Sequence, residues 1–142
     1  MVIASDDNIY YLSGGKRMSK LIYIIDDEKE ICELLKIVLE SRNYEVQVGY
    51  DGSDALVMIE KKKPDLLIID LRMPKINGYE VIARLKETQE TAKIPIMVLT
   101  SLTKGSRKSD EEWKKSMDVQ DFITKPFEPL GILKRVQNII GQ

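Results

Sequence analysis

Apolar residues fall into short blocks along this chain, and most blocks are followed by a polar turn and then by apolar residues at helical spacing. Two of the blocks, Leu21 to Ile25 and Leu66 to Ile69, are unbroken apolar runs, which are typical of strands buried on both faces of a sheet. Three further strands are predicted at Glu45 to Val48, Ile94 to Leu99 and Phe122 to Thr124. The pattern therefore predicts five strands that alternate with helices.

Cap residues indicate where several of the predicted helices begin. Asn77 lies three residues before Glu80, and Ser109 lies three residues before Glu112, and both spacings are typical of helix N-caps. Pro129 suits the first position of the last helix. We expect that helix to bury four apolar residues, namely Leu130, Leu133, Val136 and Ile140.

Five strands alternating with five helices predict an α/β fold with a parallel sheet, covered by helices on both faces and joined by right-handed crossovers. In such sheets ligands bind beyond the carboxyl ends of the strands, where the strand order reverses. Residues 1–19 show no sustained period, and we expect a poorly ordered leader there; a translation start at Met18 is an alternative explanation of this segment. Residues 20–142 are expected to form one folded domain.

Composition excludes several classes of function. The chain has 142 residues and a formal net charge of −1, so no bulk field attracts it to nucleic acid or to a membrane surface. No apolar run approaches the roughly 18 residues of a membrane span. The lone cysteine, Cys32, is expected to be a buried small hydrophobe rather than a reactive thiol, which fits a reducing, cytoplasmic setting. Histidine is absent from the sequence, so the usual general base and the commonest metal ligand are missing.

Polar residues stand at the carboxyl ends of four predicted strands. Asp26 and Asp27 follow the first strand, Asp70 the third and Thr100 the fourth, while Lys125 follows the fifth. If the strand order is 2-1-3-4-5, the first and third strands are neighbours and three carboxylates converge. Unit charges about 4 Å apart repel by about 4 kcal/mol at an effective dielectric of 20, so the cluster needs a cation, and its oxygen ligands suit Mg²⁺. Each residue alone also has an ordinary explanation: an acid after a strand can cap the next helix, and a lysine before a proline is usually solvated.

The residues at these strand ends, with the turns beside them, resemble the signature of the response-regulator receiver domains of two-component signalling. The matching segments are Ile25-Asp26-Asp27-Glu28, Asp70-Leu71-Arg72-Met73-Pro74, Gly78, Thr100-Ser101 and Phe122-Ile123-Thr124-Lys125-Pro126-Phe127. The resemblance covers about residues 20–141. It implies a flavodoxin-like, doubly wound sheet of five parallel strands in the order 2-1-3-4-5 with five helices.

The resemblance also implies roles for individual residues. Asp70 would be the phosphoacceptor, and Mg²⁺ would be bound by Asp27, Asp70 and the backbone carbonyl of Arg72, with Asp26 acting mainly through water. The same resemblance implies three further features, namely contacts of Lys125 and Thr100 with the phosphoryl oxygens, a cis peptide bond between Lys125 and Pro126, and a switch in which Thr100 moves and Phe122 turns inward. For Phe122, plain core packing is the alternative that the sequence leaves open.

A receiver of this kind implies a phosphorylation-activated signalling switch, with slow autodephosphorylation, rather than an enzyme. Because the sequence has no histidine, the phosphoryl donor would be another protein, a sensor histidine kinase or a histidine phosphotransfer protein. The fourth helix, fifth strand and fifth helix would form the face that signals to a downstream effector protein. The predicted fifth helix reaches almost to Gln142, so we expect no DNA-binding output domain and no direct contact with nucleic acid. We also expect no membrane insertion, because no apolar run is long enough, and a monomer or weak homodimer.

Two other functions stay open, and three features depart from the family pattern. One of the three is Arg72, two residues past Asp70, which is expected to alter the lifetime of the acyl phosphate. A receiver-like docking module would work without phosphorylation, and a Mg²⁺-dependent phosphohydrolase would use an aspartyl phosphate; the common hydrolase pattern has an aspartate where this chain has Arg72. The interval from Thr100 to Lys125 is longer than usual, with the extra residues near Lys104 to Lys108. Asp118 stands where the family usually has glycine, so the fourth helix is expected to be short, shifted or mobile.

Overall fold

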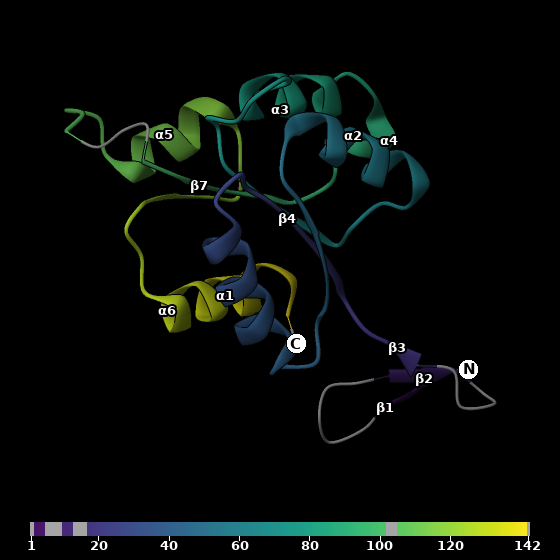
Figure 1. The fold of residues 1–142 in the computed structure, drawn as a ribbon. Coiled ribbons are helices and arrows are strands. Elements are labelled where there is room, and N and C mark those ends of the chain that lie inside the picture. The colour runs from purple at the N-terminus through teal and green to yellow at the C-terminus, as the bar shows by residue number, and fades with distance from the viewer. Residues whose placement is uncertain (1, 5–9, 13–16, 102–104, 142) are drawn as a thin grey trace.

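A single parallel sheet organises the chain in the computed structural model, which describes residues 2–4, 10–12, 17–101 and 105–141 (Figure 1). The sheet has five strands in the order β5-β4-β6-β7-β8. Their bounds are β4 (Leu21–Ile25), β5 (Glu45–Gly49), β6 (Leu66–Ile69), β7 (Ile96–Thr100) and β8 (Asp121–Thr124). All four neighbouring pairs are parallel. With β4 counted as the first strand, this is the predicted order 2-1-3-4-5, and the flavodoxin-like fold is confirmed.

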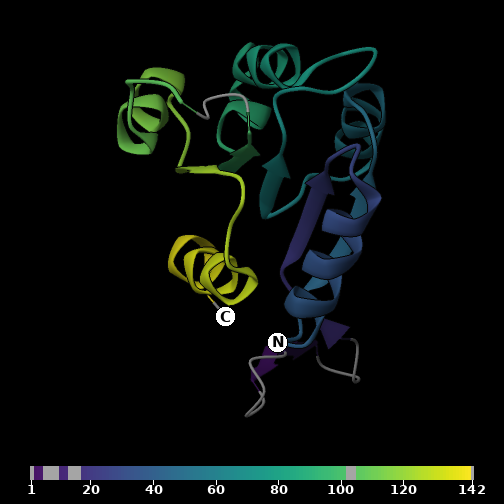
Figure 2. The same cartoon turned by 60° about the vertical axis from the view of Figure 1, so that its left-hand side comes forward.

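Helices cover both faces of the sheet, as Figure 2 shows. One face carries α1 (Lys29–Glu40) and α6 (Pro129–Ile140). On the other face lie α2 (Gly52–Lys61), α3 (Gly78–Lys86), α4 (Gln89–Ala92) and α5 (Asp110–Met117). Each face has its own apolar core, and the central strands β4 and β6 contribute to both, which is why their sequences are apolar without interruption.

Strand register determines which polar residues meet at the carboxyl edge of the sheet. Ile25 of β4 pairs with Ile69 of β6, so the residues that follow them, Asp26 and Asp70, emerge side by side. Thr100 pairs with Thr124 in the same way. Lys125 therefore leaves β8 at the edge where the aspartates lie.

The predicted helix starts are confirmed at atomic detail. The Asn77 side chain accepts a hydrogen bond from the Glu80 backbone N–H at 3.0 Å. Ser109 and Glu112 form a reciprocal capping box at the start of α5. Pro129 occupies the first turn of α6, where its missing N–H costs no hydrogen bond.

Three expectations about the elements need correction. The described residues contain six helices rather than five, because Thr88 caps a single additional turn, α4, between α3 and β7. Strand β7 begins at Ile96 and not at Ile94, since Pro95 has no N–H to donate to a ladder. Leu130 is 71% exposed, so its predicted burial was wrong. At about 100° per residue Leu130 lies roughly 120° from the centre of the stripe that α6 buries, which consists of Ile132, Leu133 and Val136 with Ile139 and Ile140 at its border.

The described strands of the predicted leader lie beyond the amino end of β4, away from the carboxyl edge (Figure 1). Strands β1 (Val2–Ala4), β2 (Tyr10–Leu12) and β3 (Arg17–Met18) form a separate antiparallel sheet there. Met1 and residues 5–9 and 13–16 of the leader, and Lys104 of the long loop, lie outside the described residues, so the degree of order expected for those segments stays a prediction. Within the described part of the chain, no helix is long and apolar enough to cross a membrane.

Candidate functional site

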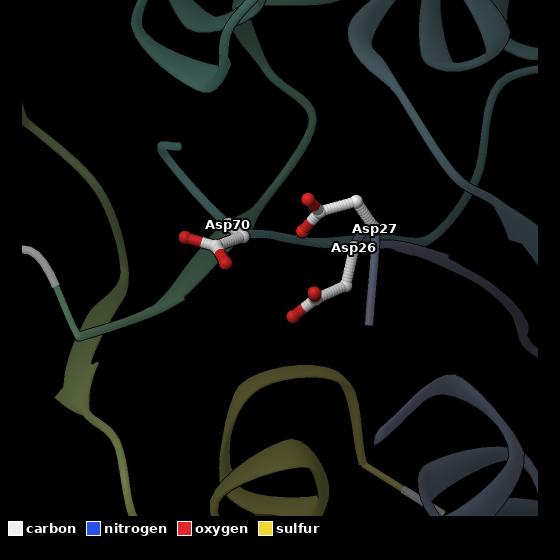
Figure 3. Close-up of side chains that lie close together, drawn as sticks. All are labelled: Asp26, Asp27 and Asp70. Carbon is white, nitrogen blue, oxygen red and sulfur yellow. The ribbon is translucent and has the colours of Figure 1, made fainter. Parts of the chain in front are cut away.

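Three carboxylates converge at the carboxyl edge of the sheet. One oxygen from each of Asp26, Asp27 and Asp70 can be chosen so that all three atoms lie within 4.8 Å of one another (Figure 3). Asp26 and Asp70 are 2% and 5% exposed, whereas Asp27 is exposed to solvent. Backbone hydrogen bonds fix the positions of the two buried residues, because the Asp70 N–H donates to the Ile25 carbonyl at 3.0 Å and the Asp26 N–H donates to the Gly49 carbonyl at 3.2 Å.

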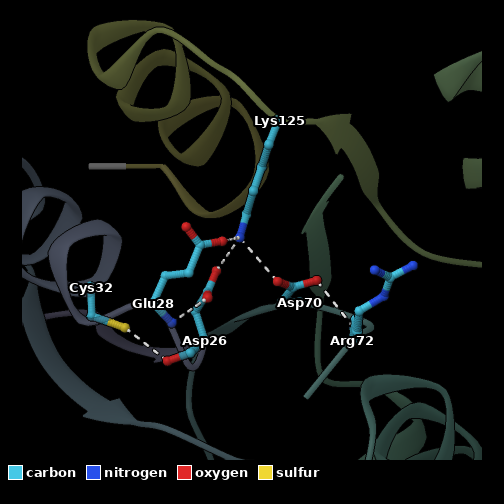
Figure 4. Close-up of polar contacts among 6 residues, drawn as sticks. All are labelled: Asp26, Glu28, Cys32, Asp70, Arg72 and Lys125. Atoms are coloured by element: carbon cyan, nitrogen blue, oxygen red, sulfur yellow. Dashed lines mark hydrogen bonds and ion pairs between the residues drawn. The ribbon is translucent and has the colours of Figure 1, made fainter. Parts of the chain in front are cut away.

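Lys125 reaches the acidic cluster from the turn that follows β8, an edge strand of the sheet (Figure 4). Its Nζ lies 2.7 Å from Asp26 Oδ2 and 2.9 Å from Asp70 Oδ2. A third carboxylate oxygen, Glu28 Oε1, lies 2.8 Å away. The Lys125 backbone N–H donates to the Thr100 carbonyl at 2.9 Å, and the peptide bond between Lys125 and Pro126 is cis. The amine thus faces the carboxylates and not open solvent.

The second oxygens of the two buried aspartates accept hydrogen bonds from the loops that follow them. Asp26 Oδ1 accepts from the Glu28 N–H at 2.9 Å, and Asp70 Oδ1 accepts from the Arg72 N–H at 3.2 Å (Figure 4). These contacts orient both carboxylates toward the centre of the site. Arg72 itself is exposed, and the role of its carbonyl as a metal ligand stays a prediction.

The site holds more negative than positive charge, with the carboxylates of Asp26, Asp27, Glu28 and Asp70 around one ammonium. Burial disfavours the charged form of Lys125, but its hydrogen bonds to Asp26, Glu28 and Asp70 outweigh this effect and raise the lysine pKa above its usual value. Burial raises the pKa of Asp26 to about 6, and the charge of Asp70 acts in the same direction, while the hydrogen bonds from Lys125 and from the Glu28 N–H oppose it. A divalent cation would relieve this excess of negative charge.

The chemistry of these donors fits Mg²⁺. The cluster offers carboxylate oxygens from two strand ends, one of them exposed to solvent, and Mg²⁺ binds oxygen ligands while retaining several waters. The donors include neither histidine nor cysteine, which the softer transition metals prefer. Asp26, Asp27 and Asp70 are therefore the described residues that could hold such an ion.

Thr100 and Phe122, the two residues expected to form a switch, lie on neighbouring strands. Thr100 is the last residue of β7 and is fully buried. Phe122 is 1% exposed and stacks on Trp113 of α5, with ring centroids 5.9 Å apart. Phe122 already packs in the core, as in the alternative that the sequence left open, and its role in a switch stays a prediction.

Gly78, which belongs to the matching motif, is required by a close approach of backbones. A Cβ atom built at Gly78 would lie 2.2 Å from the Asp70 carbonyl oxygen and 2.7 Å from the Leu71 Cα. The Gly78 N–H also donates to the Leu71 carbonyl at 2.9 Å. Any larger residue would push the start of α3 away from the backbone that carries Asp70.

Sequence reasoning missed two contacts of the site. Glu28 was noted only as part of a motif, although its place directly after two aspartates was a usable signal. Asp110, at the start of α5, binds Thr124 next to Lys125, and nothing in the sequence pattern pairs these two residues, which are 14 positions apart.

Comparisons with known proteins agree with this geometry. Residues 22–137 match the family model described as the response regulator receiver domain. The response regulator GtcR of Aneurinibacillus migulanus is 42% identical over 120 residues, which cover 84% of this chain and 47% of GtcR. The alkaline phosphatase synthesis transcriptional regulatory protein PhoP of Bacillus subtilis is 37% identical over 127 residues, covering 87% of this chain and 49% of PhoP. The chain thus spans about half the length of these relatives.

Solved structures of similar fold include receiver proteins that are covered almost completely. A response regulator from Chloroflexus aurantiacus superposes with a TM-score of 0.77 at 33% identity, covering 88% of this chain and all of the other. The chemotaxis response regulator CheY4 of Vibrio cholerae gives a TM-score of 0.74 at 28% identity, with 86% and 99% of the two chains covered. The chain belongs to the response regulator receiver domain family of two-component signalling systems.

Proposed function

We propose that this receiver is a switch activated by phosphorylation of Asp70 with the help of Mg²⁺. The observation that carries the proposal is the Lys125 ammonium, which lies 2.9 Å from Asp70 and 2.7 Å from Asp26 beside the three-aspartate cluster. A nucleophilic carboxylate, a fixed cation and ligands for a divalent ion are the parts that transfer of a phosphoryl group requires.

The phosphoryl group comes from a phosphohistidine of a partner protein, because this sequence contains no histidine. An Asp70 carboxylate oxygen attacks phosphorus in line, the new O–P bond forms as the P–N bond breaks, and the imidazole leaves with the electron pair. Lys125 stabilises the charge on the phosphoryl oxygens through its ammonium. Asp27 and Asp70, with the Arg72 carbonyl and with Asp26 acting through water, would hold Mg²⁺, which would supply further charge stabilisation when bound.

The acyl phosphate is read on the face formed by α5, β8 and α6. Thr100 ends β7 at the site, and β7 pairs with β8, which carries Phe122. Donation of a hydrogen bond from the Thr100 hydroxyl to the phosphoryl group would shift the end of β7, and the packing of Phe122 on Trp113 would pass that shift to α5. The partner that reads this face is a downstream effector protein, and the donor is a sensor histidine kinase or a histidine phosphotransfer protein.

Acetyl phosphate with Mg²⁺ tests the proposal against its two alternatives. A persistent mass gain of one phosphoryl group, mapped to Asp70 and absent from Asp70→Asn, supports the switch. Steady release of phosphate without a persistent adduct would support the phosphohydrolase. Neither adduct nor phosphate release would support a docking module that works without phosphorylation.

A further inference from the structure

The Lys125 ammonium has no free N–H group for a new ligand. An ammonium carries three N–H donors. Three carboxylate oxygens lie within 3 Å of Nζ, at 2.7 Å (Asp26), 2.8 Å (Glu28) and 2.9 Å (Asp70) (Figure 4). A phosphoryl oxygen that reaches Lys125 must therefore displace one of these partners.

The three partners differ in how readily water can replace the lysine. The side chains of Asp26 and Asp70 are 3% and 7% exposed, whereas that of Glu28 is 54% exposed. A buried carboxylate that loses its cation is left unsolvated, at high cost, while an exposed one is hydrated at once. This cost applies to Asp26 throughout and to Asp70 while the phosphoryl group approaches, before the new O–P bond removes the carboxylate charge. Glu28 is therefore the partner that leaves.

Its surroundings also allow Glu28 to move without disturbing the fold. The backbone of Glu28 is fixed, because its N–H donates to Asp26 Oδ1 and its carbonyl accepts from the N–H groups of Ile31 and Cys32 at the start of α1. The side chain instead borders an open pocket of about 420 Å³ that it shares with Lys125 and Phe127. A rotation of the side chain into this pocket leaves the capping contacts intact.

We propose that Glu28 is a positioning residue that holds Lys125 in the unphosphorylated receiver, competes with the incoming phosphoryl group for the ammonium, and thereby slows phosphorylation. This inference rests on the proposed function of Asp70. Glu28 also adds a negative charge beside the path of an anionic donor, which acts in the same direction. The glutamate that directly follows the two aspartates in the sequence thus sets how readily Asp70 is phosphorylated.

Two variants, each of which removes one negative charge, distinguish the loss of the Glu28–Lys125 contact from a general electrostatic effect. Glu28→Gln removes the carboxylate that contacts Lys125, and Glu30→Gln removes an exposed carboxylate from the first turn of the same helix. We expect Glu28→Gln to raise the rate of phosphorylation by acetyl phosphate by up to about fivefold, the upper end of the effect of an ion pair with an exposed partner. Glu30→Gln should match the wild type.

A measurement without turnover complements the rate. Glu28→Gln should bind beryllofluoride, a phosphoryl mimic, up to about fivefold more tightly in a calorimetric titration at saturating Mg²⁺. A separate Mg²⁺ titration without beryllofluoride should give the same half-maximal Mg²⁺ concentration for Glu28→Gln and wild type. Equal rates and affinities in Glu28→Gln and wild type would overturn the inference, and so would weaker Mg²⁺ binding by the variant, which would make Glu28 a metal ligand. If neither protein is phosphorylated at Asp70, the proposed function itself fails.

Discussion

The Asp110 carboxylate, at the first residue of α5, accepts hydrogen bonds from both the backbone N–H and the hydroxyl of Thr124, the last residue of β8. The bond from the N–H is 3.0 Å long. Thr124 directly precedes Lys125, so this pair connects α5 to the strand end that carries the lysine of the site. None of the eight residues of α5 is fully buried, so the helix is held by this contact together with the stacking of Trp113 on Phe122.

Replacing Asp110 should therefore loosen the anchoring of α5. Hydrogen bonds to a charged group contribute about 1.5–3 kcal/mol, and we expect Asp110→Ala to lower the free energy of unfolding by about that amount, measured by urea denaturation. Glu111→Ala is the matched control, because Glu111 is an exposed acid in the same turn and pairs only at 3.8 Å with Lys114. A loss as large in Glu111→Ala would assign the effect to the helix dipole rather than to Thr124.

Truncation should destabilise the fold much more at Phe122 than at Leu130. Phe122 is fully buried against Trp113, and removal of a buried phenyl ring costs about 3–5 kcal/mol. Leu130 is exposed, so Leu130→Ala should change the free energy of unfolding by less than about 0.5 kcal/mol. Comparable losses in the two variants, measured by the same urea titration, would contradict the placement of Leu130 outside the core.

Cys32 should be inert in the folded protein. The thiol is 1% exposed, and burial raises its pKa to about 12 from an ordinary value of 9.0. We expect iodoacetamide at pH 8 to alkylate the denatured chain rapidly and the native chain only at the rate of its unfolding, as followed by mass spectrometry. Rapid labelling under native conditions would disprove the burial of the thiol.

The same pKa shift fixes the sign of a pH effect on stability. Above pH 9 the unfolded chain loses the thiol proton, whereas the folded chain keeps it until about pH 12. The folded state then binds more protons than the unfolded state, so this group lowers the free energy of unfolding as pH rises through that window. Cys32→Ala should show a shallower decline above pH 9 than the wild type, and identical slopes would contradict the shift.

Mg²⁺ should stabilise the fold through the three aspartates. At about 100 times its Kd a ligand that binds only the native state adds about 2.7 kcal/mol, so Mg²⁺ should raise the midpoint of thermal unfolding and excess chelator should reverse the rise. Asp27→Asn should reduce the rise, while Glu33→Gln, which removes an exposed acid of α1, should leave it unchanged. An equal rise in Asp27→Asn would exclude Asp27 as a ligand.

The sequence predicted the sheet better than the helix surfaces, for a physical reason. The bounds of strands β4 and β6 were predicted to the residue. A strand buried on both faces, such as Leu66–Ile69, is a continuous apolar run, so the first polar residue on each side marks its ends. Helix faces depend on how each helix is rotated against the sheet, which local spacing does not determine, and Leu130 was therefore misplaced. The single turn of α4 is too short to leave a period at all.

The candidate site was predictable where it follows from topology and not where it depends on side-chain reach. Parallel strands bring their carboxyl ends together, so the meeting of Asp26, Asp70 and Lys125 followed from the strand order. The contact of Glu28 with Lys125 depends on one rotamer of an exposed side chain, and the contact of Asp110 with Thr124 depends on the path of a long loop. Neither has a periodic signature.

The position of Lys125 bears on how the protein is made. The lysine is 99 residues from Asp26 and 55 from Asp70 along the chain, yet its ammonium joins both. During synthesis the aspartates leave the ribosome well before the lysine, and until β8 is added to the sheet they lack the cation that offsets their charge. Under the proposed function, an incomplete nascent chain therefore lacks the lysine that phosphoryl transfer to Asp70 requires, and only the completed sheet can accept the group.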